Sequence, residues 1–174
     1  MSSWSIDTSH SELSFSVRHM MFAKVRGSFL RWTGSVDADD AGVLRGVGAE
    51  VQIDSIDTRE AGRDAHLKSA DFFDAANHPV MSFRSTGVSG DTGGRFQIAG
   101  ELTIRGTTRP VTLDAEFTGG GKDPWGNTRR GYRATTRLNR TEFGLNWNAA
   151  LELGGVLVGE EVDIAVEVEV VKQG

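Results

Sequence analysis

The sequence of residues 161–170 is Glu161-Val162-Asp163-Ile164-Ala165-Val166-Glu167-Val168-Glu169-Val170. β-Branched residues occupy every second position of this segment, and mostly charged residues stand between them. Because successive side chains of a strand point to opposite faces, this alternation predicts a half-buried strand. The C-terminal part of the chain therefore belongs to a sheet, whose other strands must lie elsewhere in the sequence.

The same period of two recurs along the chain. It is clear in residues 13–19, 47–53, 96–104, 111–117 and 132–138, and weaker in 81–84 and 24–37. In the last of these the alternation slips between Phe29 and Trp32, which one extra residue, a bulge, explains. Turn-forming stretches such as Gly90-Asp91-Thr92-Gly93-Gly94 separate most of the segments. Eight short strands with one polar face predict an all-β fold, either an antiparallel sandwich or a barrel.

Two other segments differ from this pattern. Residues 59–75 read as one short helical segment, which Asn77-His78-Pro79 ends. The loop from Gly144 to Gly159 is long and apolar, so we expect it to pack against something. It either covers its own chain's barrel mouth or packs on a second copy, and we expect a homodimer. The 174 residues fit a single domain over 1–174.

Composition excludes several classes of protein. The chain has no cysteine, which rules out disulfides and thiolate chemistry. Its 19 basic and 24 acidic residues give a net charge of -5, which argues against nucleic-acid binding. No apolar run approaches the roughly 18 residues of a membrane-spanning helix. The start of the chain has no signal-peptide pattern, so we expect a cytoplasmic protein, with a periplasmic or secreted location as the alternative.

Signals for chemistry are weak. The spacing of His10, His19, His66 and His78 matches no known metal-ligand motif, so we expect no metal and no cofactor. Ser69 lies near His66 in sequence, but no strained nucleophile turn surrounds it. We therefore assign no catalytic residue and expect that the protein is not an enzyme.

Several ordered motifs, taken together, carry a resemblance to a known family. They are Trp4-Ser5-Ile6-Asp7-Thr8-Ser9-His10-Ser11, Phe15-Ser16-Val17-Arg18-His19, Arg63-Asp64-Ala65-His66-Leu67-Lys68-Ser69-Ala70-Asp71-Phe72-Phe73-Asp74, Gly100-Glu101-Leu102-Thr103-Ile104-Arg105-Gly106-Thr107-Thr108-Arg109-Pro110-Val111 and Asn139-Arg140-Thr141-Glu142-Phe143-Gly144-Leu145. In this order and over nearly the whole chain, they resemble the YceI-like family of polyisoprenoid-binding proteins.

The resemblance implies a closed eight-stranded antiparallel up-and-down barrel, lipocalin-like in shape. It also implies binding, carriage, transport or storage of a long apolar isoprenoid lipid, such as an isoprenoid quinone or a prenyl phosphate, inside that barrel. Many relatives are dimers. Separately from the resemblance, we expect transient contact with a membrane and no nucleic-acid partner. Many members are periplasmic and carry a signal peptide, whereas this chain begins almost at the first motif.

The strand parity identifies the residues that we expect to line a lipid cavity. These lipid-binding candidates are Phe15, Val17, Phe29, Val51, Ile53, Met81, Phe83, Phe96, Ile98, Leu102, Ile104, Leu113, Phe117 and Ala134, with Trp147 over one mouth. Small residues on the inward faces leave space for a channel; they are Ala49, Gly100, Ala115, Ala134 and Thr136. The alternative is ordinary alternation of large and small side chains in a filled core.

Polar residues near one mouth are candidates for contact with a lipid head group. His19, Arg63 and His66 offer cationic or hydrogen-bonding groups to a quinone carbonyl or a phosphate. The alternative is that Arg63, Asp64 and Asp71 form an ion-pair network that docks the helical segment onto the barrel.

A second basic group lies farther along the chain. Arg133 and Arg137 precede a strand that carries Glu161, Asp163 and Glu167, so antiparallel pairing sets opposite charges side by side on the solvent face. Two other functions stay open at this point: a structural or stress-related interaction module without lipid, and an enzyme that acts on a lipid.

Overall fold

A computed structural model describes residues 2–39, 41–152 and 154–173. Its strands are β1 (Ser2–Ile6), β2 (Glu12–His19), β3 (Ala23–Phe29), β4 (Trp32–Ala38), β5 (Leu44–Gln52), β6 (Ile56–Asp57), β7 (Val80–Gly90), β8 (Arg95–Ile104), β9 (Thr107–Lys122), β10 (Thr128–Asn139) and β11 (Val158–Lys172). Its helices are α1 (Ala61–Lys68) and three short 3₁₀ helices, η1 (Thr8–His10), η2 (Ile53–Ser55) and η3 (Arg140–Phe143). Within these residues, no helix has the length and apolarity needed to cross a membrane.

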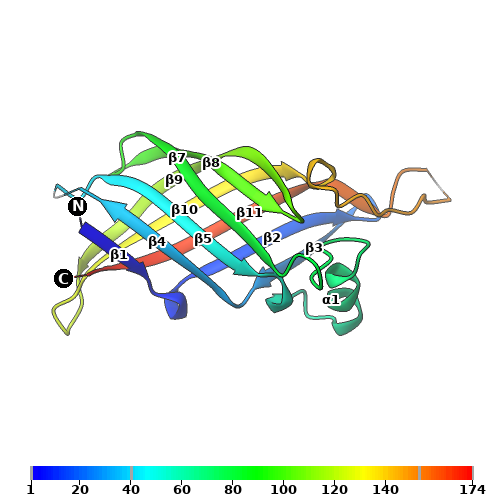
Figure 1. Cartoon of the computed structure of the whole chain (residues 1–174), viewed down its shortest axis with the longest axis horizontal. Helices are drawn as coiled ribbons and strands as arrows, with labels where there is room; N and C mark the ends of the chain where they lie inside the picture. Colours follow the sequence, from blue (N-terminus) through cyan, green and yellow to red (C-terminus); the bar gives the residue numbers. More distant parts are fainter. Residues whose placement is uncertain (1, 40, 153, 174) are drawn as a thin grey trace.

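The strands close into one antiparallel barrel (Figure 1). Neighbours follow the order β1-β4-β5-β7-β8-β9-β10-β11, and β11 pairs again with β1, which completes a ring of eight. β2 lies beyond β1 along the same side of β11, and β3 pairs with β2 where β4 pairs with β1. The closed, eight-stranded, up-and-down barrel is therefore confirmed. Two of its strand positions are each interrupted: one is made of β1 and β2, and the next of β4 and β3.

The alternation of side chains along the strands is as the sequence predicts. In β8, the even-numbered residues from Phe96 to Ile104 are buried, and most residues between them are exposed. On the outer face, Arg133 stands opposite Glu167 and Arg137 opposite Asp163, with N–O distances of 3.7 and 2.7 Å. The prediction that acidic residues of the neighbouring strand flank these arginines is confirmed.

Two predicted boundaries are corrected. The slip between Phe29 and Trp32 is a break between β3 and β4, in which Leu30 points to solvent and its amide bonds to the Ser55 carbonyl. The helix predicted over 59–75 spans only Ala61–Lys68. It stops because Ser69 adopts an extended conformation and its side chain bonds back to the His66 carbonyl, and turns follow from there.

The two ends of the barrel are built differently. Both chain termini lie at one end, whereas α1 and the loop between η3 and β11 lie at the other (Figure 1). The end with the termini is packed by a buried cluster that includes Trp4, Phe96 and Tyr132. Arg130 lies over the Trp4 ring, 5.5 Å from its centroid, and bonds to the Gly42 carbonyl. The candidate site therefore opens toward the end with α1.

Candidate functional site

Three apolar cavities follow one another from the barrel interior to the α1 end. We call them the inner cavity (about 170 Å³), the middle cavity (about 110 Å³) and the mouth cavity (about 330 Å³). Leu13, Met81 and Ile164 line both the inner and the middle cavity. The walls shared by the middle and mouth cavities are formed by Phe15, Val17, Leu67, Phe72 and Val158. The three cavities therefore adjoin one another in series, with shared side-chain walls between them.

Most of the residues that the sequence nominated as lipid-binding border these cavities. The inner cavity is lined by Val51, Met81, Phe83, Phe96, Ile98, Leu102, Leu113 and Ala134. Phe29 and Ile104 line the middle cavity, Phe15 and Val17 line both outer cavities, and Trp147 lines the mouth cavity. The small residues Ala49, Ala115 and Thr136 also border the inner cavity.

Three residues that the sequence predicts to border the lipid cavity do not line any of the three cavities. Ile53 is buried in η2 within the core, and Phe117 packs beside Tyr132, so neither lines the three cavities. Gly100 does not leave free space, because the ring of Phe83 lies over it and occupies the position of a Cβ atom. Here glycine allows close approach of an aromatic ring to the backbone, which sequence parity does not distinguish from a gap.

Other lining residues were missed. Trp32, Val36, Leu44 and Tyr132 line the inner cavity, and Phe73 lines the middle one. Parity along 24–37 and 132–138 marks Trp32 and Tyr132 as inward-facing, so the signal was present. Phe73 follows α1 in an irregular segment, where no periodicity indicates direction.

The helix α1 brings the predicted head-group residues to the mouth. Its N-terminus is capped by Glu60, whose carboxylate accepts hydrogen bonds from the amides of Gly62 and Arg63. His19, Arg63 and His66 all border the mouth cavity, together with Arg18, while the surface that faces this cavity is almost entirely apolar. Among the described residues, no aspartate or glutamate lines this cavity, so its polar side chains are basic.

Arg63 is held by Thr58 and not by Asp71. Its Nε donates to the Thr58 hydroxyl at 2.8 Å, and its Nη2 donates to the Thr58 carbonyl at 2.6 Å. Asp64 accepts from both the amide and the hydroxyl of Thr58. The anticipated ion pair between Arg63 and Asp71 is wrong, because Asp71 instead contacts the His66 Nε2 at 2.8 Å.

An aromatic group covers the mouth cavity. The ring of His66 lies edge-on to those of Phe72 and Trp147, with centroids 5.0 and 4.6 Å away. Phe72 and Trp147 are themselves 5.5 Å apart. Trp147 thus lies at the mouth, as the sequence predicts, and is held there by residues of α1 and the turn after it.

The loop that carries Trp147 is fastened by a buried arginine. Arg140 is 6% exposed, and its guanidinium donates to the carbonyls of Leu145, Trp147, Val158 and Gly159 over 2.6–3.2 Å. Burial lowers the pKa of Arg140, opposed by the charge of Glu160. One side chain therefore fixes both ends of the loop, and sequence periodicity gave no sign of this.

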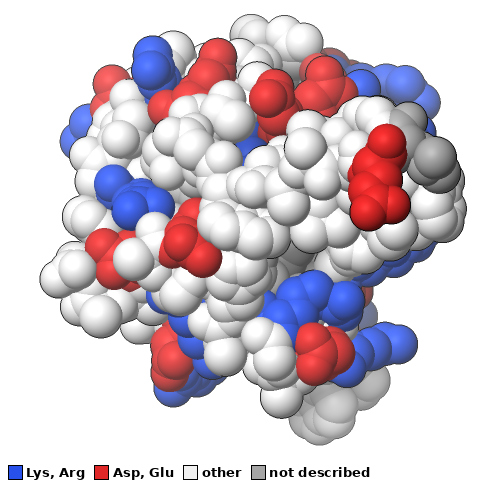
Figure 2. All heavy atoms as spheres, turned by 90° about the vertical axis from the view of Figure 1, so that its right-hand side faces the viewer, with Lys and Arg blue, Asp and Glu red and all other residues white. Residues whose placement is uncertain are grey.

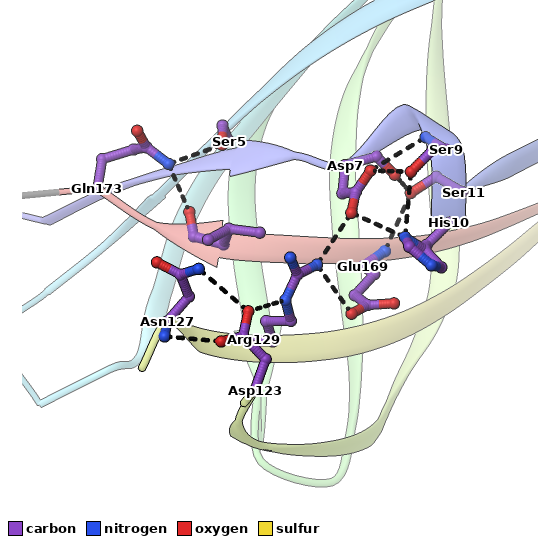
Figure 3. Close-up of polar contacts among 11 residues, drawn as sticks. Ser5, Asp7, Ser9, His10, Ser11, Asp123, Asn127, Arg129, Glu169 and Gln173 are labelled. Carbon is purple, nitrogen blue, oxygen red and sulfur yellow. Dashed lines mark hydrogen bonds and ion pairs between the residues drawn. The ribbon is translucent and has the colours of Figure 1, made fainter. Parts of the chain in front are cut away.

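A polar cluster joins the strands at the opposite end (Figure 3). Arg129 contacts Asp123, Asp7 and Glu169 at 2.7, 2.9 and 3.1 Å. Hydrogen bonds to the Asp7 carboxylate, the strongest from the Ser9 hydroxyl and weaker ones from Arg129 and His10, hold its pKa well below the usual range. Arg129 lowers the pKa of Asp123 to about 2. This cluster lies away from the cavities and ties the N-terminal segment to β10 and β11.

The fold and site define a class: closed eight-stranded antiparallel barrels whose apolar interior opens at one end. The YceI-like domain family matches residues 4–170, and the chain belongs to this family. A UPF0312 protein of Staphylococcus aureus is 37% identical over 172 residues, which cover 97% of each chain. A UPF0312 protein of Vibrio cholerae is 38% identical over 143 residues, covering 80% of this chain and 76% of that one.

Solved structures show the same fold. A YceI protein of Campylobacter jejuni is 25% identical with a TM-score of 0.79, covering 90% of each chain. BcnA of Burkholderia cenocepacia is 20% identical with a TM-score of 0.80, covering 94% of this chain and 98% of that one. A domain of Saccharophagus degradans, described as polyisoprenoid-binding, is 12% identical with a TM-score of 0.70 and covers 98% of each chain.

Proposed function

We propose that this protein binds one long isoprenoid lipid in its barrel and carries or stores it as a non-enzymatic carrier. The observation that carries the proposal is the series of three apolar cavities from the barrel interior to a basic mouth. Family membership supports it, as does the polyisoprenoid-binding description of the Saccharophagus degradans domain.

The interior suits a hydrocarbon chain. The inner and middle cavities are lined almost entirely by aliphatic and aromatic side chains. Burial of apolar surface stabilises such a complex by about 0.8 kcal/mol per methylene. A tail of about forty carbons would nominally exceed the practical limit of about 18–21 kcal/mol for noncovalent binding. Ordering the chain and removing it from a membrane offset most of that gain, so we expect an exchangeable complex.

The separate cavities must merge to admit a long tail. Leu13, Met81 and Ile164 divide the inner from the middle cavity. Met81 is unbranched with three rotatable bonds, so it changes rotamer more readily than its branched neighbours. We therefore expect these side chains to move aside, with the barrel strands unchanged, when lipid enters.

The mouth suits a polar head group that accepts hydrogen bonds. Arg63 uses Nε and Nη2 for Thr58, and its guanidinium has further donors at Nη1. His19 and Arg18 line the same cavity, with no carboxylate in its described wall. A quinone carbonyl or a prenyl phosphate matches this set of donors.

Extraction of the purified protein tests the proposal. Protein prepared without detergent should yield a prenyl lipid on organic extraction, or should take up a quinone with a prenyl tail of about forty carbons from micelles. Protein that contains no lipid and also takes up neither this quinone nor a prenyl phosphate contradicts the proposal. Chemical turnover of the added lipid would favour an enzyme instead.

A further inference from the structure

The turn between β2 and β3 presents apolar side chains to solvent. Met20, Met21 and Phe22 are 39%, 54% and 78% exposed. Hairpin turns in water are usually built from Gly, Asn and Asp, which satisfy the turn geometry and favour solvent. Three large apolar side chains in a row at such a tip are therefore unusual and indicate a contact outside the folded chain.

The backbone conformation of this turn also disfavours the methionines that occupy it. Met20 and Met21 have φ angles of 54° and 67°, in the left-handed region that glycine and asparagine adopt most easily. Methionine at these positions strains the backbone, and glycine or asparagine would form the same turn with less strain. Strain that persists in a fold often accompanies a functional requirement.

The tip lies at the rim of the mouth cavity. The Met20 amide donates to the Leu157 carbonyl at 2.7 Å, and an atom added as Cβ on Gly155 would come within 3.0 Å of Met21. Val156, which is 36% exposed, extends the same surface. We call Met20, Met21, Phe22 and Val156 the apolar rim. Figure 2 shows this end of the molecule, where uncharged atoms run across the middle and charged side chains of both signs surround them.

Basic residues stand directly behind the tip. Arg18 and Lys24 are paired across β2 and β3, two residues from the turn, and both are exposed. Asp163 of β11 is bonded to Arg137, which lowers its pKa, and the charges of Lys24 and Arg18 lower that pKa further. Apolar side chains at a tip with cations behind them match the acyl chains and head-group phosphates of a bilayer surface.

We propose that the apolar rim inserts into the surface of an anionic lipid bilayer and turns the mouth cavity toward the membrane. This inference rests on the proposed function, because a water-insoluble lipid must enter and leave the barrel through an apolar phase. A second copy of this chain is the rival occupant of the rim, since the sequence-based expectation of a homodimer stays a prediction.

Vesicle flotation tests the inference, with phosphatidylcholine vesicles that contain about one-third phosphatidylglycerol. The wild-type protein should float with the vesicles, and Phe22→Ser and Met21→Asn should each reduce binding about tenfold. Trp125→Ser is the matched control, since Trp125 is 81% exposed in the turn between β9 and β10 and should not affect binding. Because asparagine favours a positive φ, Met21→Asn should melt no lower than the wild type, which separates lost binding from lost folding.

Three results overturn the inference: wild-type protein that does not float, variants that float like the wild type, or a wild-type dimer in light scattering that Phe22→Ser dissociates. Uptake of ubiquinone with a tail of about forty carbons from detergent micelles separates this inference from the proposed function. Uptake from micelles without vesicle binding removes only the membrane contact, whereas absent uptake removes the carrier function itself.

Discussion

The imidazole of His66 meets the indole of Trp147 edge to face, with ring centroids 4.6 Å apart and planes at 83°. His66 lies in α1 and Trp147 in the loop before β11, so segments about eighty residues apart along the chain meet over one cavity. The position of the aromatic cover over the mouth therefore depends on both α1 and the loop before β11.

Trp147→Ala should loosen this cover. It removes two aromatic pairs, each worth about 0.5–1.5 kcal/mol, while the barrel strands remain. We expect bound quinone to pass to acceptor vesicles several times faster, with a modest loss of stability in urea unfolding. Trp125→Ala, at the opposite end, serves as the control. Equal transfer rates for Trp147→Ala and the wild type would exclude Trp147 from the exit path.

Arg63→Ala and His66→Ala should have different effects. Arg63 donates two bonds to Thr58, which is buried, so its loss should lower stability by about 1–3 kcal/mol in the lipid-free protein. His66→Ala removes a contact with the half-exposed Asp71, which contributes little, and the edge-on contacts with Phe72 and Trp147, so its effect should fall mainly on the cover of the mouth. Thermal melts with and without ubiquinone measure both effects. A large lipid-free loss for Arg63→Ala, with uptake intact in the folded fraction, would remove Arg63 from the head-group site.

Arg140→Met should be among the most damaging single changes. It removes the side-chain donor from the carbonyls of Leu145, Trp147 and Gly159, whereas the Val158 carbonyl keeps the Asn148 amide as a donor. A buried unsatisfied group costs about 1–3 kcal/mol. We expect a loss of more than about 3 kcal/mol in urea unfolding, with faster proteolysis of the loop. Arg137→Met, on an exposed ion pair, should change stability by less than about 1 kcal/mol. Similar losses for both variants would show that the buried arginine does not fasten the loop.

Stability should fall in acid through the Arg129 cluster. The pKa of Asp123 is about 2 in the folded protein, and that of Asp7 is also lowered, against about 3.9 in an unfolded chain. Because the unfolded state then binds more protons, the stabilisation is present above about pH 4 and is lost as the pH falls toward 2. Urea unfolding from pH 6 to 2 should show a flatter profile for Arg129→Gln than for the wild type and Arg133→Gln. Parallel profiles for all three would contradict this role.

The sequence predicted the barrel well and the mouth only in part. Period-two alternation depends on strand geometry, so the pattern alone assigns residues such as Leu102 and Ile104 to the inner face, where they lie. The contacts that form the mouth come from irregular segments. The bonds from Arg140 to carbonyls and from Arg63 to Thr58 depend on backbone paths that no periodicity describes. Within a strand, Gly100 shows what the alternation cannot predict: the space that its missing side chain leaves is filled by the ring of Phe83.

Blocking the inner cavity tests whether the barrel interior is the binding site. Ala134 borders this cavity, whereas Thr135, next to it on β10, faces solvent. Ala134→Trp should fill the cavity at a cost of about 1–3 kcal/mol, which a domain of this size survives. Thr135→Trp provides a matched substitution on the outer face.

Native mass spectrometry after incubation with ubiquinone micelles tests the central claim most directly. The wild-type protein and Thr135→Trp should each carry one lipid per chain, and folded Ala134→Trp should carry none. A wild-type spectrum that shows only the mass of the bare polypeptide, or equal lipid binding by Ala134→Trp, would contradict a lipid site inside this barrel.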